Sequence, residues 1–521
     1  MEEKNGAETL VHTLLAGKVD LCFANPGTSE MQFVAALDKI EGMRCVLGLF
    51  EGVCTGAADG YARMTDRPAA TLLHLAPGLA NGLANLHNAR RAQVPIVNIV
   101  GEHRQGHKQT DSPLTGDIEG VARTMSAWVK TSTSADDIAA DAAEAIRAAK
   151  TLPGQVATLI LPADTAWTAA RPHGALSFDA PAPTLPVDAK FDAAIQALRS
   201  GDKVTLVLAG RALRAAPLAL AGQIVQRTGC TMLAQYSNGR MERGAGRVPI
   251  TRTPAPVDEG VAAFKDAQQV ILIGAKVPAP MFGYPGKPDF LMQPGAKLIE
   301  LTLPGDDLHA TLKELAGRLG ALGETPAVDL ARELVIPSGT PTPDTVLRTI
   351  AALIPDNAIV IDESISAGRT FFPASMGARP HDYLQLTGGA IGSGIPMAVG
   401  AAIACPDRKV INMEGDGSSM YTIQALWTQA REKLDVLTII FANRGYQILK
   451  KELVGVGAIE WGAQAERMLT IAQPDISWVK LAEGMGVEAA AADSCEQLAD
   501  LMRAALARKC PFLIEVRMNR G

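Results

Sequence analysis

Two polar side chains that suit a metal ion follow apolar stretches in the last quarter of the chain. Asp416 lies in the turn 414–417, directly after an apolar run that begins at Val410, and Asn443 follows the apolar run 436–442. A helical stretch separates the two runs, so the pattern predicts a strand, a helix and a second strand. Because the carboxyl ends of parallel strands lie at one edge of a sheet, we expect Asp416 and Asn443 to converge.

This pair and its glycine-rich turn have the chemistry of a magnesium diphosphate site. A carboxylate and an amide oxygen are hard-cation ligands, and magnesium is usually bound by few carboxylates together with phosphates. The turn around Gly415 and Gly417 also offers backbone N–H groups to an anion. A magnesium diphosphate site is therefore the first hypothesis.

The elements that must position these residues alternate between strands and helices. In the first part of the chain, the predicted strand 44–50 ends at Glu51, the apolar run 69–75 contains His74, and the run 94–100 leads into a loop rich in titratable residues. This alternation predicts an α/β fold built from doubly wound parallel sheets, with polar groups at the strand ends.

Two proline-rich stretches divide the chain into three parts. A chain of 521 residues is too long for one hydrophobic core. The stretches 162–190 and 335–343 have little periodicity and read as linkers. We therefore expect three doubly wound parallel-sheet domains, at residues 1–170, 188–334 and 344–521.

The composition excludes several classes of protein. Only 4% of residues are aromatic and the net charge is −6, which argues against a nucleic-acid partner. The seven cysteines include no CxxC pair, so neither a disulfide framework nor a zinc site is indicated. The N-terminus has no apolar signal region and no run approaches the length of a membrane span. We expect a cytoplasmic protein without a membrane partner.

Several motifs occur together along the chain: the turn Gly415-Asp416-Gly417 followed by Asn443, Glu51 after a strand, and Asn25-Pro26-Gly27 before it. With the stretches GGAIGSGIPMAVGAAIACPDRKVINMEGDGS and EGVCTGAADGYAR, they resemble the thiamine-diphosphate enzymes of the acetolactate synthase, pyruvate oxidase and benzoylformate decarboxylase family. The resemblance covers essentially the full chain. It implies a pyrimidine-binding, a central and a diphosphate-binding domain, with thiamine diphosphate and Mg²⁺ as cofactors.

The resemblance assigns three expected catalytic residues. Glu51 is expected to hydrogen-bond the pyrimidine ring of the cofactor and thereby promote loss of the thiazolium C2 proton. His74, in the stretch LHLAPG, matches a histidine that benzoylformate decarboxylase presents at this strand end. Thr28, in NPGTSE, matches the active-site serine of that decarboxylase and keeps its hydroxyl.

The same resemblance implies the cofactor and substrate contacts. The expected magnesium ligands are Asp416, the Asn443 side chain and the Gly445 carbonyl, and Ile391 matches the apolar wedge on which the family bends its cofactor. The full set of expected cofactor contacts is Asn25, Pro26, Gly27, Glu51, Ser366, Gly389, Ile391, Gly415, Asp416, Gly417, Ser418, Ser419, Asn443, Gly445 and Tyr446. The candidate substrate contacts are His103, His107, Ile448 and Leu449.

The active-site pattern is most similar to benzoylformate decarboxylase, which implies non-oxidative decarboxylation of a 2-oxo acid, with or without carboligation. One departure is that the central-domain histidine of that decarboxylase is missing, since the corresponding stretch 281–285 reads MFGYP. Acetolactate synthase is an alternative, although Pro113-Leu114 stands where that enzyme has a Phe-Gln pair. No flavin signature is present, so FAD is not expected.

Two further alternatives stay open. The chain could be a non-catalytic paralogue that binds the cofactor, or a magnesium-dependent phosphatase or nucleotide enzyme built around Asp416. Glu51 argues against both, because neither needs it. The family places the two ends of the cofactor on different subunits, which implies a homodimer or homotetramer with active sites between subunits.

Overall fold

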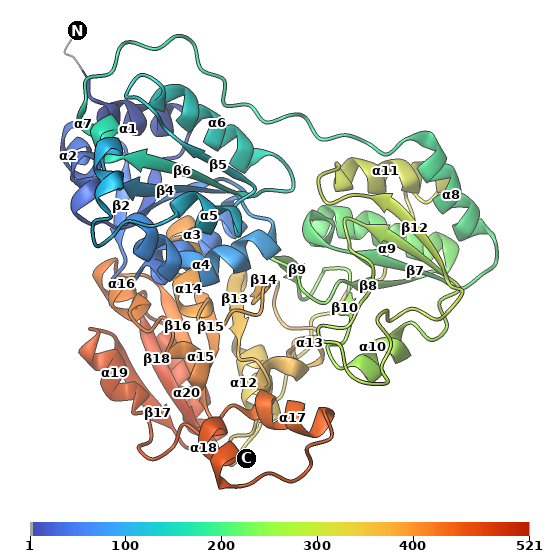
Figure 1. Ribbon diagram of the computed structural model, residues 1–521. Helices are drawn as coiled ribbons and strands as arrows, with labels where there is room; N and C mark the ends of the chain where they lie inside the picture. The colour runs from blue at the N-terminus through green and yellow to red at the C-terminus, as the bar shows by residue number, and fades with distance from the viewer. Residues whose placement is uncertain (1–3, 520–521) are drawn as a thin grey trace.

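Three sheets, each flanked by helices, account for most of the chain in the computed structural model, which describes residues 4–519 (Figure 1). All neighbouring strands within these sheets are parallel except at one edge of the third sheet. The predicted α/β class with three parallel-dominated sheets is confirmed. We call the parts the N-terminal, central and C-terminal units.

The N-terminal unit holds a six-stranded sheet in the order β2-β1-β3-β4-β6-β5. Its two longest strands, β4 and β6, are buried along their whole length, as expected for a parallel sheet covered on both faces. The elements of this unit are α1 (Gly6–Ala16), β1 (Leu21–Asn25), η1 (Thr28–Glu30), α2 (Met31–Lys39), β2 (Arg44–Leu47), α3 (Glu51–Thr65), β3 (Ala69–Leu73), α4 (Leu75–Ala92), β4 (Ile96–Glu102), η2 (Gln105–Thr110), α5 (Ile118–Arg123), β5 (Trp128–Thr131), α6 (Ile138–Lys150), β6 (Val156–Pro162) and α7 (Ala163–Trp167).

The central unit holds a five-stranded parallel sheet in the order β10-β8-β7-β11-β12. A long segment without helix or strand, residues 170–187, leads into it along the outside of the molecule (Figure 1). Its elements are α8 (Asp188–Arg199), β7 (Val204–Leu208), η3 (Gly210–Leu213), α9 (Ala215–Thr228), β8 (Thr231–Ala234), β10 (Thr251–Arg252), α10 (Val257–Ala263), β11 (Gln269–Ile273), β12 (Lys297–Thr302) and α11 (Leu308–Leu319).

The C-terminal unit holds a seven-stranded sheet in the order β17-β18-β16-β15-β13-β14-β9. Its first helix begins at Pro343, the last residue of the second proline-rich stretch, with Thr342 as the N-cap. Its later elements are β13 (Ala358–Glu363), η4 (Ala367–Thr370), α13 (Phe371–Ala374), β14 (His381–Gln385), α14 (Gly394–Ala404), β15 (Val410–Gly415), α15 (Asp416–Ser419), α16 (Ala425–Arg431), β16 (Val436–Ala442), α17 (Gln447–Gly455), α18 (Ala463–Leu469), α19 (Trp478–Gly484), β17 (Glu488–Ala492), α20 (Cys495–Leu506) and β18 (Phe512–Arg517), after α12 (Pro343–Leu353).

One strand departs from the pattern that the sequence predicts. β9 (Met241–Arg243) lies within the range expected for the central domain, yet it pairs antiparallel with β14 of the C-terminal unit. A three-residue edge strand carries too little periodicity to be recognised from sequence. It links the central unit directly to the C-terminal sheet.

The N-terminal and C-terminal units pack together through α3 and α14, whose buried side chains belong to one hydrophobic core. A Cβ atom on Gly60 would lie 2.1 Å from the Met397 carbonyl oxygen, and one on Gly400 would lie 1.8 Å from the Ala57 carbonyl oxygen. The two helices therefore touch backbone to backbone, which only glycine permits at these positions.

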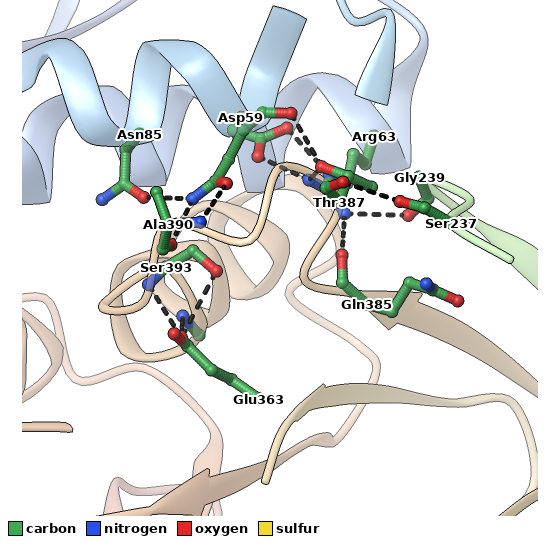
Figure 2. Close-up of polar contacts among 12 residues, drawn as sticks. Asp59, Arg63, Asn85, Ser237, Gly239, Glu363, Gln385, Thr387, Ala390 and Ser393 are labelled. Atoms are coloured by element: carbon green, nitrogen blue, oxygen red, sulfur yellow. Dashed lines mark hydrogen bonds and ion pairs between the residues drawn. The ribbon is translucent and has the colours of Figure 1, made fainter. Parts of the chain in front are cut away.

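A buried arginine joins all three units. Arg63 of α3 pairs with Asp59 at 2.7 Å and donates to the carbonyl oxygens of Gly239, at 3.1 Å, and Gln385, at 2.6 Å (Figure 2). It also donates to the Thr387 hydroxyl at 3.1 Å. These bonds hold the start of a glycine-rich loop of the C-terminal unit against the N-terminal unit.

Across residues 4–519, none of the helices has both the length and the apolar character of a bilayer span.

Candidate functional site

The structure brings together the three residues predicted to bind magnesium. β15 and β16 are neighbouring parallel strands, so Asp416 and Asn443 follow them at the same edge of the sheet. The Arg444 N–H donates to Asp416 Oδ2 at 2.5 Å, and the Gly417 N–H donates to Asp416 Oδ1 at 2.9 Å. The Gly445 N–H donates to Asn443 Oδ1 at 3.0 Å. The loop after β16 thus closes over the Asp416 carboxylate.

Burial raises the pKa of Asp416 to about 6, although the N–H groups of Arg444 and Gly417 act in the opposite direction. A carboxylate held at this depth lacks a full counter-charge, and a divalent cation would supply one. No group of three or more His, Cys, Asp or Glu side chains within residues 4–519 has metal-binding geometry. A metal at this loop would therefore rely on one carboxylate, an amide oxygen and a carbonyl, a donor set that fits magnesium.

The turn after β15 is buried and closely packed. A Cβ atom on Gly417 would lie 2.4 Å from the Tyr446 ring, so the ring covers the turn only because residue 417 is glycine. The hydroxyl groups of Ser418 and Ser419 both donate to the Gly415 carbonyl, at 3.0 and 2.8 Å. The helical stretch predicted after this turn is split into α15, of four residues, and α16.

The glycine loop, residues 387–394, carries two more of the predicted cofactor contacts. Gly389 is exposed and has a φ of +79°, a conformation that favours glycine, and Ile391 is half-buried. A Cβ atom on Gly389 would lie 3.2 Å from the terminal methyl group of Met281, so the central unit reaches this loop. Ser366 is half-buried, three residues after the end of β13.

Side chains of α4 hold the glycine loop from the N-terminal unit (Figure 2). Asn88 donates to the Ala390 carbonyl at 2.7 Å, and Asn85 donates to the Gly392 carbonyl at 3.1 Å. The same Asn85 amide also donates to the Gly52 carbonyl at 2.8 Å. The start of α3 and the glycine loop of the same chain therefore share one amide group.

A buried carboxyl group holds the other end of the loop. Glu363, at the end of β13, accepts hydrogen bonds from the N–H groups of Gly392, at 2.5 Å, Ser393, at 2.7 Å, and Gly394 (Figure 2). Burial raises the pKa of Glu363 to about 7, although these N–H groups lower it. Its neighbour across the strand pair, Glu414, is also fully buried, and its pKa lies well above the usual range because of burial and the Glu363 charge. One of these two groups is thus expected to stay protonated at neutral pH.

Glu51 begins α3, but the strand predicted over 44–50 is shorter, because β2 ends at Leu47 and the chain leaves the sheet before the helix starts. Glu51 is buried, with 9% of its surface exposed, and its Oε2 accepts a hydrogen bond from the Asn81 side chain at 2.9 Å. A Cβ atom on Gly78 would lie 3.1 Å from Glu51 Oε1. The carboxyl group is therefore held in one orientation, with glycine leaving room beside it.

His74 and Glu30 form a second polar pair at the carboxyl edge of the N-terminal sheet. The Nδ1 atom of His74 lies 2.8 Å from Glu30 Oε2, which also accepts the Gly27 N–H at 2.7 Å. A Cβ atom on Gly27 would lie 2.3 Å from the His74 ring. The turn and the ring therefore fit each other closely. Thr28 is exposed at the start of η1, and the Asn25 amide donates to the Gly48 carbonyl at 2.8 Å, which closes the turn.

The candidate substrate contacts are less closely tied to these groups. His103 lies 3.0 Å from the Ser112 hydroxyl, and its ring is edge-on to that of His107. His107 lies in the 3₁₀-helix η2, whereas His103 precedes it in irregular backbone. Ile448 and Leu449 lie on α17, which has no buried residue, and Leu449 is 45% exposed.

The predicted residues form two groups, one on each terminal sheet. Glu51 and His74 belong to the first group and Asp416 and Asn443 to the second. Within residues 4–519, no hydrogen bond or ion pair joins the two groups.

Comparison with known proteins assigns the family. Two family models match, one described as "Thiamine pyrophosphate enzyme, N-terminal TPP binding domain" over residues 4–122 and one as the C-terminal TPP binding domain over residues 370–516. A benzoylformate decarboxylase of Pseudomonas aeruginosa is 30% identical over 526 residues, covering 95% of each chain. The chain belongs to the thiamine pyrophosphate enzymes.

Two further relatives of this thiamine pyrophosphate enzyme bear on its chemistry. A Mycobacterium tuberculosis protein, IlvX, provisionally named as an acetolactate synthase large subunit, is 49% identical over 514 residues, covering 98% of each chain. The structure of a thiamine diphosphate-dependent 4-hydroxybenzoylformate decarboxylase from Rhodococcus jostii RHA1 superposes with a TM-score of 0.83 at 26% identity, covering 99% of this chain and 100% of the other. Thiamine pyrophosphate and thiamine diphosphate are the same cofactor.

Sequence reasoning missed three polar residues that position the predicted site of this thiamine pyrophosphate enzyme: Glu30, Asn81 and Glu363. Glu30 had a local signal, because it lies three residues after the Gly27 turn, a spacing at which a glutamate can accept the turn N–H. Glu363 is the last residue of β13, but the sequence does not reveal its partners 29 to 31 residues later. Asn81 is one of several amides on α4 and has no distinguishing pattern.

Proposed function

We propose that this protein catalyses the non-oxidative decarboxylation of a 2-oxo acid, in the manner of benzoylformate decarboxylase, with thiamine diphosphate and Mg²⁺ as cofactors. The observation that carries the proposal is the pair of His74 and Glu30 at the carboxyl edge of the N-terminal sheet. A histidine whose Nδ1 is fixed by a carboxylate presents Nε2 in a defined direction, as a proton donor or acceptor requires.

The first proposed roles concern the binding of the cofactor. Bound thiamine diphosphate would supply the electron sink that holds the carbanion left by loss of carbon dioxide. Asp416, Asn443 and the Gly445 carbonyl would bind magnesium, and the turn at Gly417 would hold the diphosphate. Glu51 would hydrogen-bond the pyrimidine ring.

The remaining proposed roles concern the substrate. His74 would move protons at the substrate, and Thr28 would bind its carboxylate through the hydroxyl. His103, His107, Ile448 and Leu449 are proposed as outer contacts. The stretch 281–285, which the resemblance matches to the missing central-domain histidine, contains Tyr284, whose hydroxyl donates to Glu452 of α17.

An acetolactate synthase-like condensation is the second candidate. The 49% identity to IlvX over nearly the whole chain favours it, since identity at this level exceeds that to the decarboxylase. Against it, Pro113 is exposed and Leu114 half-buried where acetolactate synthases have a Phe-Gln pair. A non-catalytic cofactor-binding role is the third candidate.

We further propose a homodimer or homotetramer, in which Glu51 of one chain faces the Asp416 loop of another. The separation of the two groups of residues within one chain supports this arrangement. The proposed domain limits remain 1–170, 188–334 and 344–521. A reducing, cytoplasmic location is supported by the seven cysteines, all of which are free thiols.

Reconstitution with thiamine diphosphate and Mg²⁺, followed by a panel of aliphatic and aromatic 2-oxo acids, tests the proposal. Carbon dioxide release, aldehyde formation and 2-hydroxy ketone formation should be measured in parallel. We expect aldehyde from at least one aromatic 2-oxo acid, and we expect His74→Ala to reduce its formation.

Each other outcome identifies a different candidate. Acetolactate from pyruvate, with no aldehyde from aromatic substrates, would replace the first proposal by the second. Cofactor binding without turnover of any 2-oxo acid would favour the non-catalytic role. Failure to bind thiamine diphosphate in the presence of Mg²⁺ would refute all three.

A further inference from the structure

A cavity lies between the central and C-terminal units, where β10 and α13 approach each other (Figure 1). Its volume is about 370 Å³, within the range of small-molecule sites, roughly 300 to 1,000 Å³. β10 is an edge strand of the central sheet and β9 is an edge strand of the C-terminal sheet, so the cavity lies between two sheet edges. Among residues 4–519, none of those predicted to bind cofactor or substrate lines it.

Most of the cavity wall is apolar. The central unit contributes Met232, Val248 and Ile250, and the segment that begins with α13 contributes Phe372 and Met376. Val248, Ile250 and Phe372 are buried, whereas Met376 is 39% exposed. The apolar part of a ligand would therefore lose its contact with water against both units, which favours binding.

One buried arginine provides a positive charge in this wall. Arg243 of β9 is 8% exposed, and its guanidinium carbon lies 3.6 Å from the centre of the Phe372 ring. Its Nη2 donates to the Phe372 carbonyl at 3.0 Å and to the Ser375 hydroxyl at 3.3 Å. Its Nε is enclosed by the protein and cannot contact a ligand, whereas Nη1 makes no hydrogen bond within residues 4–519 and keeps accessible surface. Nη1 is therefore the donor that a ligand can reach.

The charge of Arg243 has no close counter-ion. Arg243 forms no ion pair in the part of the chain that the structure describes. Burial lowers the pKa of Arg243 to about 10, although Tyr383 and Asp329 act in the opposite direction, so the group is charged at neutral pH. A buried charge without a counter-ion is costly, and an anion in the cavity would reduce this cost.

We propose that this cavity binds a small carboxylic acid with an apolar body, whose carboxylate accepts a hydrogen bond from Arg243 Nη1 and whose body packs against Phe372 and Met376. A carboxylate is favoured over a neutral group because a hydrogen bond between charged partners is roughly twice as strong. An apolar α-amino acid would in addition bring an ammonium group to Asp329, a half-buried residue that lines the same cavity. The site does not depend on the proposed reaction.

The ligand would also join two units. Met232 and Thr251 belong to the central sheet, whereas Phe372 and Pro373 belong to α13 of the C-terminal unit. A ligand that binds only the folded protein raises its Tm. Occupation of the cavity should therefore stabilise the intact protein against unfolding.

Isothermal titration and thermal unfolding of the intact protein, with thiamine diphosphate and Mg²⁺ at saturation, test the site. The probe is 3-phenylpropanoate, and 3-phenylpropanamide has the same apolar body without the charge. We expect 3-phenylpropanoate to raise Tm and to bind at least tenfold more tightly than the amide. Arg243→Gln should weaken its binding at least tenfold. Arg379→Gln is the matched control and should bind as the wild type does, because Arg379 lies two residues before β14 with its side chain 66% exposed.

A second pair of variants keeps the test decisive if Arg243→Gln does not fold. Met376→Trp should fill part of the cavity and weaken binding at least tenfold while Arg243 stays in place. Leu322→Trp is its control, because Leu322 is 51% exposed in the central unit and does not line the cavity. The control should bind 3-phenylpropanoate with unchanged affinity.

L-Phenylalanine distinguishes the two sources of the carboxylate. Tighter binding of L-phenylalanine than of 3-phenylpropanoate, lost in Asp329→Asn, would identify an amino acid as the ligand. Tighter binding of 3-phenylpropanoate, unchanged in Asp329→Asn, would identify a plain carboxylic acid. The proposal would be overturned if neither acid bound, if 3-phenylpropanoate and its amide bound equally, or if neither Arg243→Gln nor Met376→Trp weakened binding.

Discussion

Removal of the Glu30 carboxylate should disable His74 without removing it. Glu30 Oε2 lies 2.8 Å from His74 Nδ1 and its side chain is fully buried, while 20% of the His74 side chain is exposed. Because Glu30→Gln keeps the shape of the side chain but replaces the acceptor pair by an amide, His74 Nδ1 loses its charged partner. A hydrogen bond to a charged group contributes about 1.5 to 3 kcal/mol.

If that energy orients the ring for proton transfer, kcat should fall about 10- to 150-fold in Glu30→Gln, since each 1.36 kcal/mol changes a rate tenfold. The assay is steady-state turnover of the best 2-oxo acid from the panel, in Glu30→Gln, His74→Ala and the double variant. Because Glu30 acts through His74, the double variant should be no slower than His74→Ala alone.

The control is Glu8→Gln. Glu8 is another buried carboxylate of the N-terminal unit, where it completes the capping box of α1 and pairs with Lys39, far from the expected site in sequence. Its loss should lower Tm and leave kcat unchanged. The reasoning would be refuted if the effects of Glu30→Gln and His74→Ala multiplied in the double variant, or if Glu30→Gln lowered only Tm.

Three other variants or conditions follow from the site. Glu51→Gln should bind thiamine diphosphate but lose exchange of its C2 proton, measured by NMR in deuterated buffer, and wild-type exchange would contradict the proposed role. Gly417→Ala should weaken cofactor binding at least tenfold by isothermal titration, because its methyl group would displace the Tyr446 ring; unchanged affinity would show that the turn is not used. The pKa of Asp416 in the folded protein is about 6, above the reference value of 3.8. Ionisation of this carboxyl group therefore destabilises the metal-free protein by about 3 kcal/mol. This destabilisation is absent below pH 3.8 and complete above pH 6. Magnesium requires the ionised form, so its affinity should fall about tenfold per pH unit below pH 6 and be constant above pH 7, and a flat profile in titrations from pH 5 to 8 would count against Asp416 as a ligand.

The sequence predicts the sheets better than it predicts what surrounds them. Buried parallel strands are continuous apolar runs, and β16 has the limits of the apolar run 436–442. The polar residues just beyond those strands, such as Asp416 and Asn443, could be placed because parallel strands share a carboxyl edge. Short edge strands such as β9 depend on a partner from another unit and leave no periodic pattern.

Residues that position other residues were harder to find. Asp416 directly follows β15, and Glu51 lies a few residues after the end of β2, so local sequence was enough to single out both. Glu363 has the same local context, but its three N–H partners are fixed by how α14 begins, which is a tertiary property. The partner of His74 is similarly set by the approach of η1 to the end of β3, which local sequence does not encode.

The close contact of α3 with α14 restricts how this enzyme can open and close. At Gly60 and Gly400 the helices meet with no space for a single methyl group, so sliding or rotating one against the other would cause backbone collisions. Hinge motion between the N-terminal and C-terminal units of one chain is therefore blocked at this contact. By contrast α17 has no buried residue, so it is held less tightly than this contact and is freer to move.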